Sequence, residues 1–519
     1  MKTVICAIMA AVMLSGCGKV EYTSGMYTDV RDWDFYTDAV AFCVNGGYMV
    51  PEGDAFGVYE PVTLTECADI ITKIIGKGEG DSIKYVVKNN IAPYDFGEWD
   101  TPATRENVAY MLSRALEQEY INPVVEGAIE DAGNSFAKDE IYSLYRMGIF
   151  SGDKERATFR PKDYMVKSEL AIIVERACNK EKRVHFDKST LRVDFVAFGD
   201  SIGHSPVLTA AYENGVYDFT ECFENVKPYV EEADVACINQ ETVFVENNFT
   251  GYPSFGTPKE MGIAEIDAGF DVITHATNHA FDRGVGGIMY TTAFWEGYPE
   301  IEMLGIHEDE ADAAEISVIE KNGIKIALLN YTYSLNGYRL PSGKEYMVDL
   351  LDEAKIRRDM ARAREISDAI VVFPHWGNEY QNKPSESQRR WAQLFADCGA
   401  TVIVGHHPHV VQPMEIVRDI TGRAVPVYYS LGNSISNQND YQNALCAMAD
   451  FTIMKDEEGV RCEKAFIEPV VTHMEPGCYS MYLLKDYSEE LATKHKHRGK
   501  YGQRFTIEAY QEVFNNIVE

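Results

Sequence analysis

The chain has 519 residues, and its 48 Lys and Arg residues against 81 Asp and Glu residues leave a formal net charge of −33. This length exceeds one ordinary hydrophobic core and predicts two or three domains. The acidic excess argues against nucleic-acid binding, because it repels a phosphate backbone and no basic stripe offsets it. With 45% hydrophobic and 12% aromatic residues, the composition is that of a globular protein and excludes collagen-like, coiled-coil, multispanning membrane and mainly disordered chains.

The start of the chain has the order of a targeting signal. Lys2 precedes an apolar run over residues 4–14, and Cys17 follows shortly after. The run is too short to span a bilayer. It resembles a bacterial lipoprotein signal, which implies removal of residues 1–16 and a lipid on Cys17 that holds the protein on the outer face of a membrane. A plain secretory signal or a buried strand is the alternative.

Nine further cysteines follow Cys17 at irregular spacing and without a CxxC pair. An odd, scattered set does not resemble a disulfide framework, so we expect most of these residues to be small and buried. The spacing gives no support for a structural zinc site either.

Residues 22–180 contain a degenerate phrase that occurs three times with a period of about fifty residues. Each copy has a helical stretch, a Gly-containing turn and a second helix that opens near Thr or Ser and an acidic residue. The copies join residues 39–47 to 62–68, 83–92 to 103–109, and 141–153 to 168–171. These units resemble surface-layer homology (SLH) repeats, a helical family whose Thr-Arg element lines grooves that hold a cell-wall polysaccharide.

The Thr-Arg element is kept in only one of the three copies, as Thr104 and Arg105. The resemblance implies glycan binding there, with the basic residue pairing with an acidic sugar substituent. A helical spacer that keeps the fold without binding glycan is the alternative.

The charged residues 181–190 break the repeat pattern and predict a linker. Beyond them, short runs of buried-strand type alternate with segments of helical period such as residues 351–366 and 386–396. The strand-like runs are residues 192–199, 235–238, 272–274, 324–330, 369–373, 401–404 and 425–429. This alternation predicts a layered α/β sandwich over residues 191–440, with residues 441–519 as an extension of the same domain.

Polar side chains follow five of these predicted strands, where ligands bind in α/β sheets. They are Asp200, residues 239–241, His275 with Asn278 and His279, His375, and residues 405–409. A single His after a strand is more often a satisfied interior residue than a ligand. Asp, Asn, Glu and His gathered at five strand ends predict instead a site for a divalent ion such as Mn²⁺, Fe²⁺ or Zn²⁺.

Six phrases in this region resemble, in the same order, those of the CapA family of capsule and poly-γ-glutamate synthesis proteins, which is related to calcineurin-like metallophosphoesterases. The phrases occupy residues 198–200, 239–242, 277–284, 375–380, 405–412 and 429–433. The resemblance spans about residues 191–440 and implies the phosphoesterase-like fold together with a role in capsule or poly-γ-glutamate biosynthesis.

The resemblance also implies roles for individual residues. His279 is expected to protonate the leaving oxygen, and Asp282 to orient its imidazole; capping of a helix is the alternative for Asp282. The implied metal ligands are Asp200, Glu241, Asn278, His375, His407 and His409. Substrate contacts are expected from Asn239, Trp376, Glu379 and Asn433.

One phrase of the relatives is missing. Their Asp-x-His is absent because Ser201 and Ile202 follow Asp200, which puts one metal position in question. His204 is either a substitute ligand or an exposed loop residue, and we expect the second.

Two functions follow from these observations. The first is a surface metalloenzyme that hydrolyses a phosphoester or another bond in an envelope polymer. The second is a non-catalytic module that binds or exports an anionic capsular polymer. The expected partners are that polymer or a cell-wall polysaccharide, the membrane through the lipid anchor, and a capsule-synthesis membrane complex.

Overall fold

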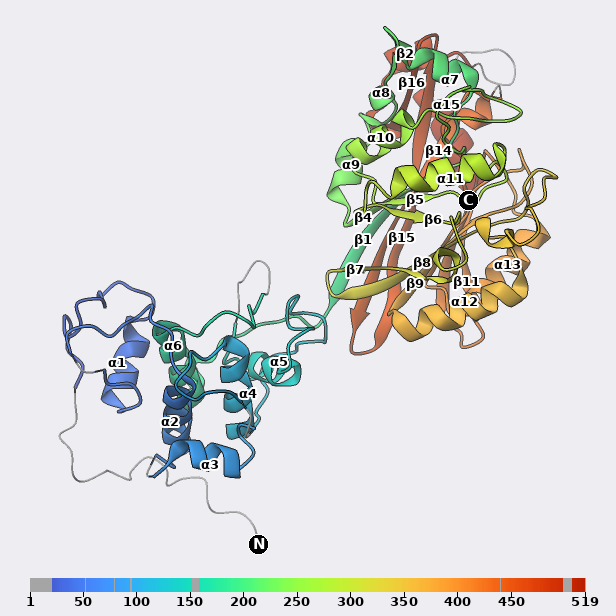
Figure 1. Cartoon of the computed structure of the whole chain (residues 1–519). Helices are drawn as coiled ribbons and strands as arrows, with labels where there is room; N and C mark the ends of the chain where they lie inside the picture. Colours follow the sequence, from blue (N-terminus) through green and yellow to red (C-terminus); the bar gives the residue numbers. More distant parts are fainter. Residues whose placement is uncertain are drawn as a thin grey trace. The chain divides into compact units, whose positions relative to one another are not determined.

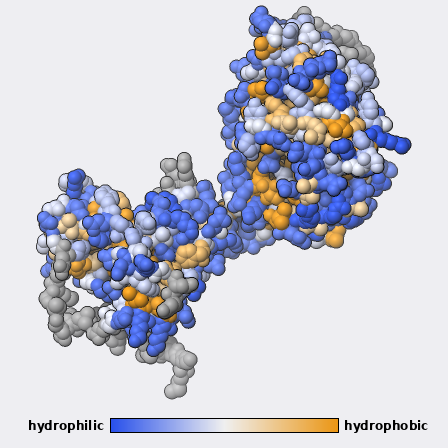
Figure 2. All heavy atoms as spheres, viewed as in Figure 1, coloured by the Kyte–Doolittle hydropathy of each residue, from blue (hydrophilic) through white to orange (hydrophobic). Residues whose placement is uncertain are grey.

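The computed structural model describes residues 21–51, 53–78, 80–93, 96–151, 158–438, 440–497 and 506–518. The chain divides between Ser189 and Thr190 into two compact units (Figure 1). The predicted signal and Cys17 lie outside the described residues. The faces of both units seen in Figure 2 are mainly hydrophilic, with apolar atoms in smaller patches. Within the described ranges, no helix is long and apolar enough to cross a membrane.

The first unit is helical. Its helices are α1 (Thr37–Asn45), α2 (Leu64–Ile74), α3 (Ser82–Lys88), α4 (Arg105–Ala115), α5 (Lys138–Arg146) and α6 (Lys167–Cys178). Thr63 begins α2 with a capping box that includes Glu66, and Thr104 begins α4 in the same way with Asn107. These reciprocal bonds satisfy backbone N–H groups that a helix leaves free at its start, which explains why a threonine directly precedes each helix.

The three segments that lead into α2, α4 and α6 form a closed ring of backbone hydrogen bonds. Val62 donates to the carbonyl of Met165 at 2.9 Å, Met165 donates to Ala103 at 2.9 Å, and Ala103 donates to Val62 at 2.8 Å. Equivalent positions of three successive helix pairs therefore meet at one point. Membership of the SLH family stays a prediction.

The second unit contains two large sheets. The eight-stranded sheet has the order β16-β15-β14-β1-β4-β5-β6, with β13 paired to β1, and the six-stranded sheet has the order β11-β12-β10-β9-β8-β7. The first comprises β1 (Leu191–Ser201), β4 (Val235–Gln240), β5 (Val272–Thr274), β6 (Glu302–Leu304), β13 (Asn433–Ile435), β14 (Leu445–Asp456), β15 (Gly459–Glu475) and β16 (Cys478–Leu483). The second comprises β7 (Ser317–Lys321), β8 (Ile324–Thr332), β9 (Ala369–His375), β10 (Val402–Val404), β11 (Val411–Arg418) and β12 (Ala424–Leu431).

Helices cover the sheets. Helices α12 (Glu353–Ile366) and α13 (Glu386–Asp397) lie against the six-stranded sheet (Figure 1). Met360 and Phe395 of these helices share one buried cluster with Tyr331 and Tyr429 of the sheet. The remaining helices are α7 (Ser205–Ala210), α8 (Thr220–Phe223), α9 (Lys227–Glu232), α10 (Glu260–Ala268), α11 (Gly284–Trp295), α14 (Glu489–Lys494) and α15 (Ile507–Val518). A short hairpin, β2 (Tyr212–Glu213) and β3 (Val216–Tyr217), completes the unit. The predicted layered α/β architecture is confirmed.

The carboxyl ends of the parallel strands lie at a common edge. Strands β1, β4, β5 and β6 run parallel, as do β8, β9, β10 and β12. At that edge His406 donates its backbone N–H to Pro374, and His407 donates its own to the Asp200 carboxylate, at 3.0 and 3.3 Å. The carboxyl ends of the two sheets therefore meet, which brings together residues from five segments of the chain.

Candidate metal centre

The ends of β1 and β4 and the loop after β10 supply one cluster of metal-ligating groups. Asp200 is the penultimate residue of β1, Glu241 directly follows β4, and His409 lies in that loop. One ligand atom from each lies within 4.8 Å of the others, and all three residues are buried. Two carboxylates and an imidazole at this separation can share one cation.

The carboxylate of Glu241 is the most unusual group in the cluster. It is buried, and neither of its oxygens has a hydrogen-bond partner among the described residues. Its Oε1 lies 3.8 Å from Nε2 of His409 and 3.9 Å from Nε2 of His375. Burial raises the pKa of Glu241 well above its ordinary value. A buried carboxylate without hydrogen bonds is unfavourable, so this residue indicates a ligand site rather than a structural role.

Asp200 and His409 form a buried ion pair. Nδ1 of His409 lies 3.0 Å from Oδ2 of Asp200, and the amide of Asn239 donates to Oδ1 at 2.8 Å. Burial opposes the charged form of each, but the hydrogen bond and charge of its partner lower the pKa of Asp200. The charges of Glu241 and Asp200 raise the pKa of His409 to about 9 against the same burial.

His375 and His407 supply neutral imidazoles. Nε2 of His375 lies 2.9 Å from Oδ1 of Asn278, and the rings of His375 and His407 are 4.9 Å apart. Burial lowers the pKa of His375 well below its usual value and that of His407 to about 3. Neither Nδ1 has a hydrogen-bond partner among the described residues. Neutral imidazole is the form that binds metal, so the His407 ring, the Nε2 of His375 that faces Glu241, and the Glu241 oxygens fit a divalent ion.

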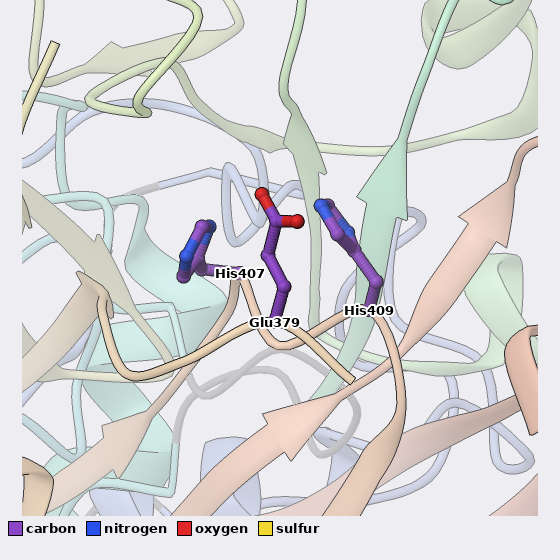
Figure 3. Close-up of side chains that lie close together, drawn as sticks. All are labelled: Glu379, His407 and His409. Carbon is purple, nitrogen blue, oxygen red and sulfur yellow. The ribbon is translucent and has the colours of Figure 1, made fainter. Parts of the chain in front are cut away.

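The loop after β10 holds its histidines in a strained conformation. His407 and His409 have φ values of 98° and 58°, in the left-handed region that costs about 1–3 kcal/mol for a residue with a side chain. Figure 3 shows the exposed Glu379 carboxylate between the two imidazoles, and ligand atoms of the three lie within 4.8 Å of one another. The backbone of Tyr380 donates to Pro408 at 2.8 Å and ties the two loops together. Glu379, expected to contact substrate, is therefore also placed to bind metal.

The structure brings His279 and Asp282 together at the edge of this cluster. Nδ1 of His279 lies 2.7 Å from Oδ2 of Asp282, and the backbone of Phe255 donates to the same oxygen at 2.8 Å. Asp282 does not cap α11, which begins after Arg283 without a side-chain cap. The imidazole is 8% exposed, so it retains some access to solvent.

The four residues expected to contact substrate lie in different surroundings. Asn239 and Asn433 are fully buried and contact Asp200 and His409, so they orient two of the predicted ligands. Trp376 is 1% exposed in the core beneath α13, where its indole N–H donates to the carbonyl of Tyr429 at 3.0 Å. The indole therefore has no free face for a substrate, whereas Glu379 is exposed.

Two further histidines near the site, His406 and His204, contact backbone groups of the second unit. Nε2 of His406 lies 3.2 Å from the carbonyl of Phe198, between the two sheets. The expectation of an exposed loop residue at His204 is wrong: the ring is partly buried against Phe255, and its Nδ1 accepts from the backbone of Asn437 at 3.2 Å. Packing around the N-terminus of α7 decides this environment.

Thr104 and Arg105 are engaged inside the first unit. Thr104 caps α4, and Arg105 is only 9% exposed. The Arg105 guanidinium donates to the carbonyl of Phe159 at 2.7 Å and pairs with Glu169. Glycan binding at this element stays a prediction.

Sequence reasoning missed Asn336, which links two site residues. Its side-chain oxygen accepts from Asn278 at 3.2 Å, and its amide lies 3.4 Å from Nδ1 of His279. Asn336 has a φ of 51° and precedes Gly337, so the Asn-Gly turn signal was present, but nothing local tied it to the site.

The second unit is similar in sequence to bacterial capsule synthesis proteins. Residues 194–438 match the family described as bacterial capsule synthesis protein PGA_cap. The PGA biosynthesis protein CapA of Bacillus subtilis (strain 168) is 31% identical over 251 residues, which cover 46% of this chain and 62% of the relative. The capsule biosynthesis protein CapA of Bacillus anthracis is 26% identical over 303 residues, which cover 53% of this chain and 72% of the relative. This region is thus similar to the bacterial capsule synthesis family and to two CapA proteins, and the chain spans less than two thirds of the first relative.

Solved structures with similarity to the chain have low overall scores. The calcineurin-like phosphoesterase YfkN from Bacillus subtilis is 12% identical and covers 63% of this chain and 98% of its own, with a TM-score of 0.34. A 5'-nucleotidase precursor from Thermus thermophilus is 13% identical and covers 54% of each chain, with a TM-score of 0.37. The fold assignment therefore rests on the sheet order described above.

Proposed function

We propose that this protein acts in capsule synthesis at the cell surface, and that its second unit uses a divalent metal ion to hydrolyse a phosphoester or another bond in an envelope polymer. One observation carries the metal centre: the buried, unpartnered Glu241 carboxylate lies within 3.9 Å of two imidazoles. The names of the two CapA relatives support the choice of a capsular polymer such as poly-γ-glutamate.

The residues that would hold the ion offer oxygen and imidazole donors without a thiolate, a set that suits Mn²⁺, Fe²⁺ or Zn²⁺. They are Asp200, Glu241, Asn278, His375, His407 and His409, with Glu379 as a further donor from the loop after β9. When bound, such an ion acts as a Lewis acid on a phosphoryl or carbonyl oxygen. Asn239 and Asn433 orient Asp200 and His409 through the contacts described above.

His279 would move the proton in this reaction. Its Nδ1 is committed to Asp282, which fixes the orientation of the ring and leaves Nε2 to exchange a proton with the substrate. The backbone of Phe255 holds Asp282 from the other side. The chain therefore supplies both the acid and its positioning residue beside the metal ligands.

Metal analysis of the full chain tests the centre. The wild type, purified without chelator, is expected by mass spectrometry to hold one or two more equivalents of Mn, Fe or Zn than a His375→Ala, His407→Ala double variant. His185→Ala is the matched control, because His185 precedes β1 and belongs to no ligand group found in the described residues. A wild type that stays empty after reconstitution would contradict the metal centre.

A non-catalytic polymer-binding module is the second candidate, favoured by exposed aromatic rings beside the cluster. Tyr333 is 43% exposed with its ring 4.6 Å from His407, and Tyr380 is 49% exposed with its ring 6.1 Å from His409. Such rings can bind a polymer without cleaving it. A His279→Gln variant separates the two functions, because an enzyme loses turnover whereas a binding module keeps its polymer phenotype.

We further propose that the protein is held at the outer face of the membrane by lipid on Cys17 and contacts the capsule-synthesis machinery there. The signal-like order of the first residues supports this location. Metabolic lipid labelling should mark the wild type and leave a Cys17→Ala variant unlabelled. Equal labelling of both would contradict the anchor.

A further inference from the structure

The turn between β15 and β16 gathers a second group of metal-ligating side chains, which shares no residue with the first. In this antiparallel hairpin Glu475 pairs directly with Cys478, and His473 lies two residues before Glu475. Directly opposed residues, and residues two apart on one strand, point to the same face of a sheet. One ligand atom from each of these three residues lies within 4.8 Å of the others.

His473 is oriented as a metal ligand would be. It is fully buried, and its Nδ1 lies 2.6 Å from the hydroxyl of Tyr487. Its Nε2 has no hydrogen-bond partner among the described residues and lies 3.6 Å from Oε1 of Glu475. Histidines that bind metal commonly commit the second ring nitrogen to a polar partner in this way. The free nitrogen of a buried ring therefore faces a carboxylate and a thiol.

Helix α8 brings a further carboxylate beside Cys478, outside the three residues whose ligand atoms all lie within 4.8 Å of one another. Oε1 of Glu221 lies 3.3 Å from Sγ of Cys478. The position of α8 is held by Ser480, whose hydroxyl donates to the carbonyl of Glu221 at 2.6 Å and accepts from the amide of Asn225 at 2.8 Å. Figure 1 shows α8 beside β16, the edge strand of the eight-stranded sheet.

We propose that His473, Glu475, Cys478 and Glu221 form a structural zinc site. One imidazole, one thiolate and two carboxylates match the mixed nitrogen, sulfur and oxygen donors of tetrahedral zinc, and the thiolate disfavours Mg²⁺ and Mn²⁺. The ion joins the β15–β16 turn to α8 and secures the edge strand. The proposal is independent of the hydrolytic function, because it uses different residues.

Cobalt substitution of the full chain tests the site, because this cluster alone contains a thiol among the ligand groups found in the described residues. Co²⁺ added to metal-free wild type should produce a thiolate-to-cobalt charge-transfer band in the near ultraviolet, with the intensity of one thiolate-bound Co²⁺ per chain. A Cys478→Ser variant should lose the band. Two controls should keep it: Cys462→Ser, a partly exposed cysteine elsewhere on β15, and the His375→Ala, His407→Ala variant of the first cluster.

A wild type without the band, or a band that survives in Cys478→Ser, would overturn the proposal. Partly exposed Glu475 offers a second substitution that spares the buried His473. Glu475→Gln should lower zinc affinity at least tenfold in a chelator competition, and Tyr487→Phe should lower it about 10–100-fold through the ring it orients. Unchanged affinity in both variants would also overturn the assignment.

Discussion

The buried polar residues of the Thr104-Arg105 element and those of the metal-ligand cluster are used in opposite ways in the two units. In the first unit Arg105 is buried, yet its guanidinium donates to Phe159 and pairs with Glu169. In the second unit Glu241 and His375 are buried even more deeply, yet keep atoms without hydrogen-bond partners among the described residues. A satisfied buried group stabilises a fold, whereas an unsatisfied one costs free energy unless a ligand completes it.

The number of hydrogen-bond partners distinguishes two elements that look equally functional as sequence motifs. Thr104-Arg105 and the histidines after β10 both match functional elements of the families they resemble. Thr104 caps a helix and Arg105 pairs with a residue of the same unit. The histidines after β10 instead lie close to metal-ligating groups from other strands. The comparison predicts that substitutions in the first unit change stability and that those in the second change chemistry.

The largest expected effect is on turnover. If the second unit is an enzyme, His279→Gln should lower kcat on an alkyl phosphodiester by about 100–10,000-fold, since that is the usual contribution of a general acid and an alkoxide leaving group needs a proton. Asp282→Asn should lower kcat by a smaller factor, because it alters the orientation of the ring and leaves the imidazole in place. His185→Ala is the control. Full activity in His279→Gln would contradict the role of His279 as the acid.

Metal removal should affect the second unit alone. At an ion concentration about 1,000 times the dissociation constant, chelation should lower its unfolding free energy by about 4 kcal/mol. The transition of the first unit should not move in the same calorimetric scan. In Glu241→Gln the second unit should lose part of this response, because one donor of the Asp200–Glu241–His409 cluster is gone while the cluster at Cys478 is unchanged. A response in the first unit, or an undiminished one in the variant, would contradict the assignment of the cluster.

Removal of a satisfied group should destabilise the first unit. Arg105→Ala breaks the bond to Phe159 and the pair with Glu169, so we expect a loss of about 2–3 kcal/mol in urea unfolding. Arg105→Lys should recover only part of it, because an ammonium lacks the planar fork. Metal content of the second unit should stay unchanged. Wild-type stability in Arg105→Ala together with lost glycan binding would favour the glycan-binding prediction.

The smallest expected effect concerns the helix cap. Thr104→Ala removes the side chain that accepts from the backbone of Asn107 and should cost about 1 kcal/mol. Thr104→Ser keeps the acceptor and serves as the matched control. Equal stability of the two variants in urea would show that the cap contributes nothing here.

The positions of the buried strands along the chain, and the polar residues that follow them, could be predicted from the sequence. Buried strands such as β4 and β9 are continuous apolar runs, and a layered α/β fold places ligands at their carboxyl ends. The caps at Thr63 and Thr104 are equally local, because the capping residues lie three positions apart. These features depend on neighbours along the chain.

Only the tertiary structure decided which polar atoms find partners. Trp376 and Glu379 belong to one phrase, yet the first is buried in the core and the second is exposed beside His407 and His409. Asn336 joins the site from a distant turn, and Cys478 meets Glu221 across 257 positions without any spacing motif. Burial and pairing arise from contacts between remote segments, so a local pattern locates a polar residue but not the groups that surround it.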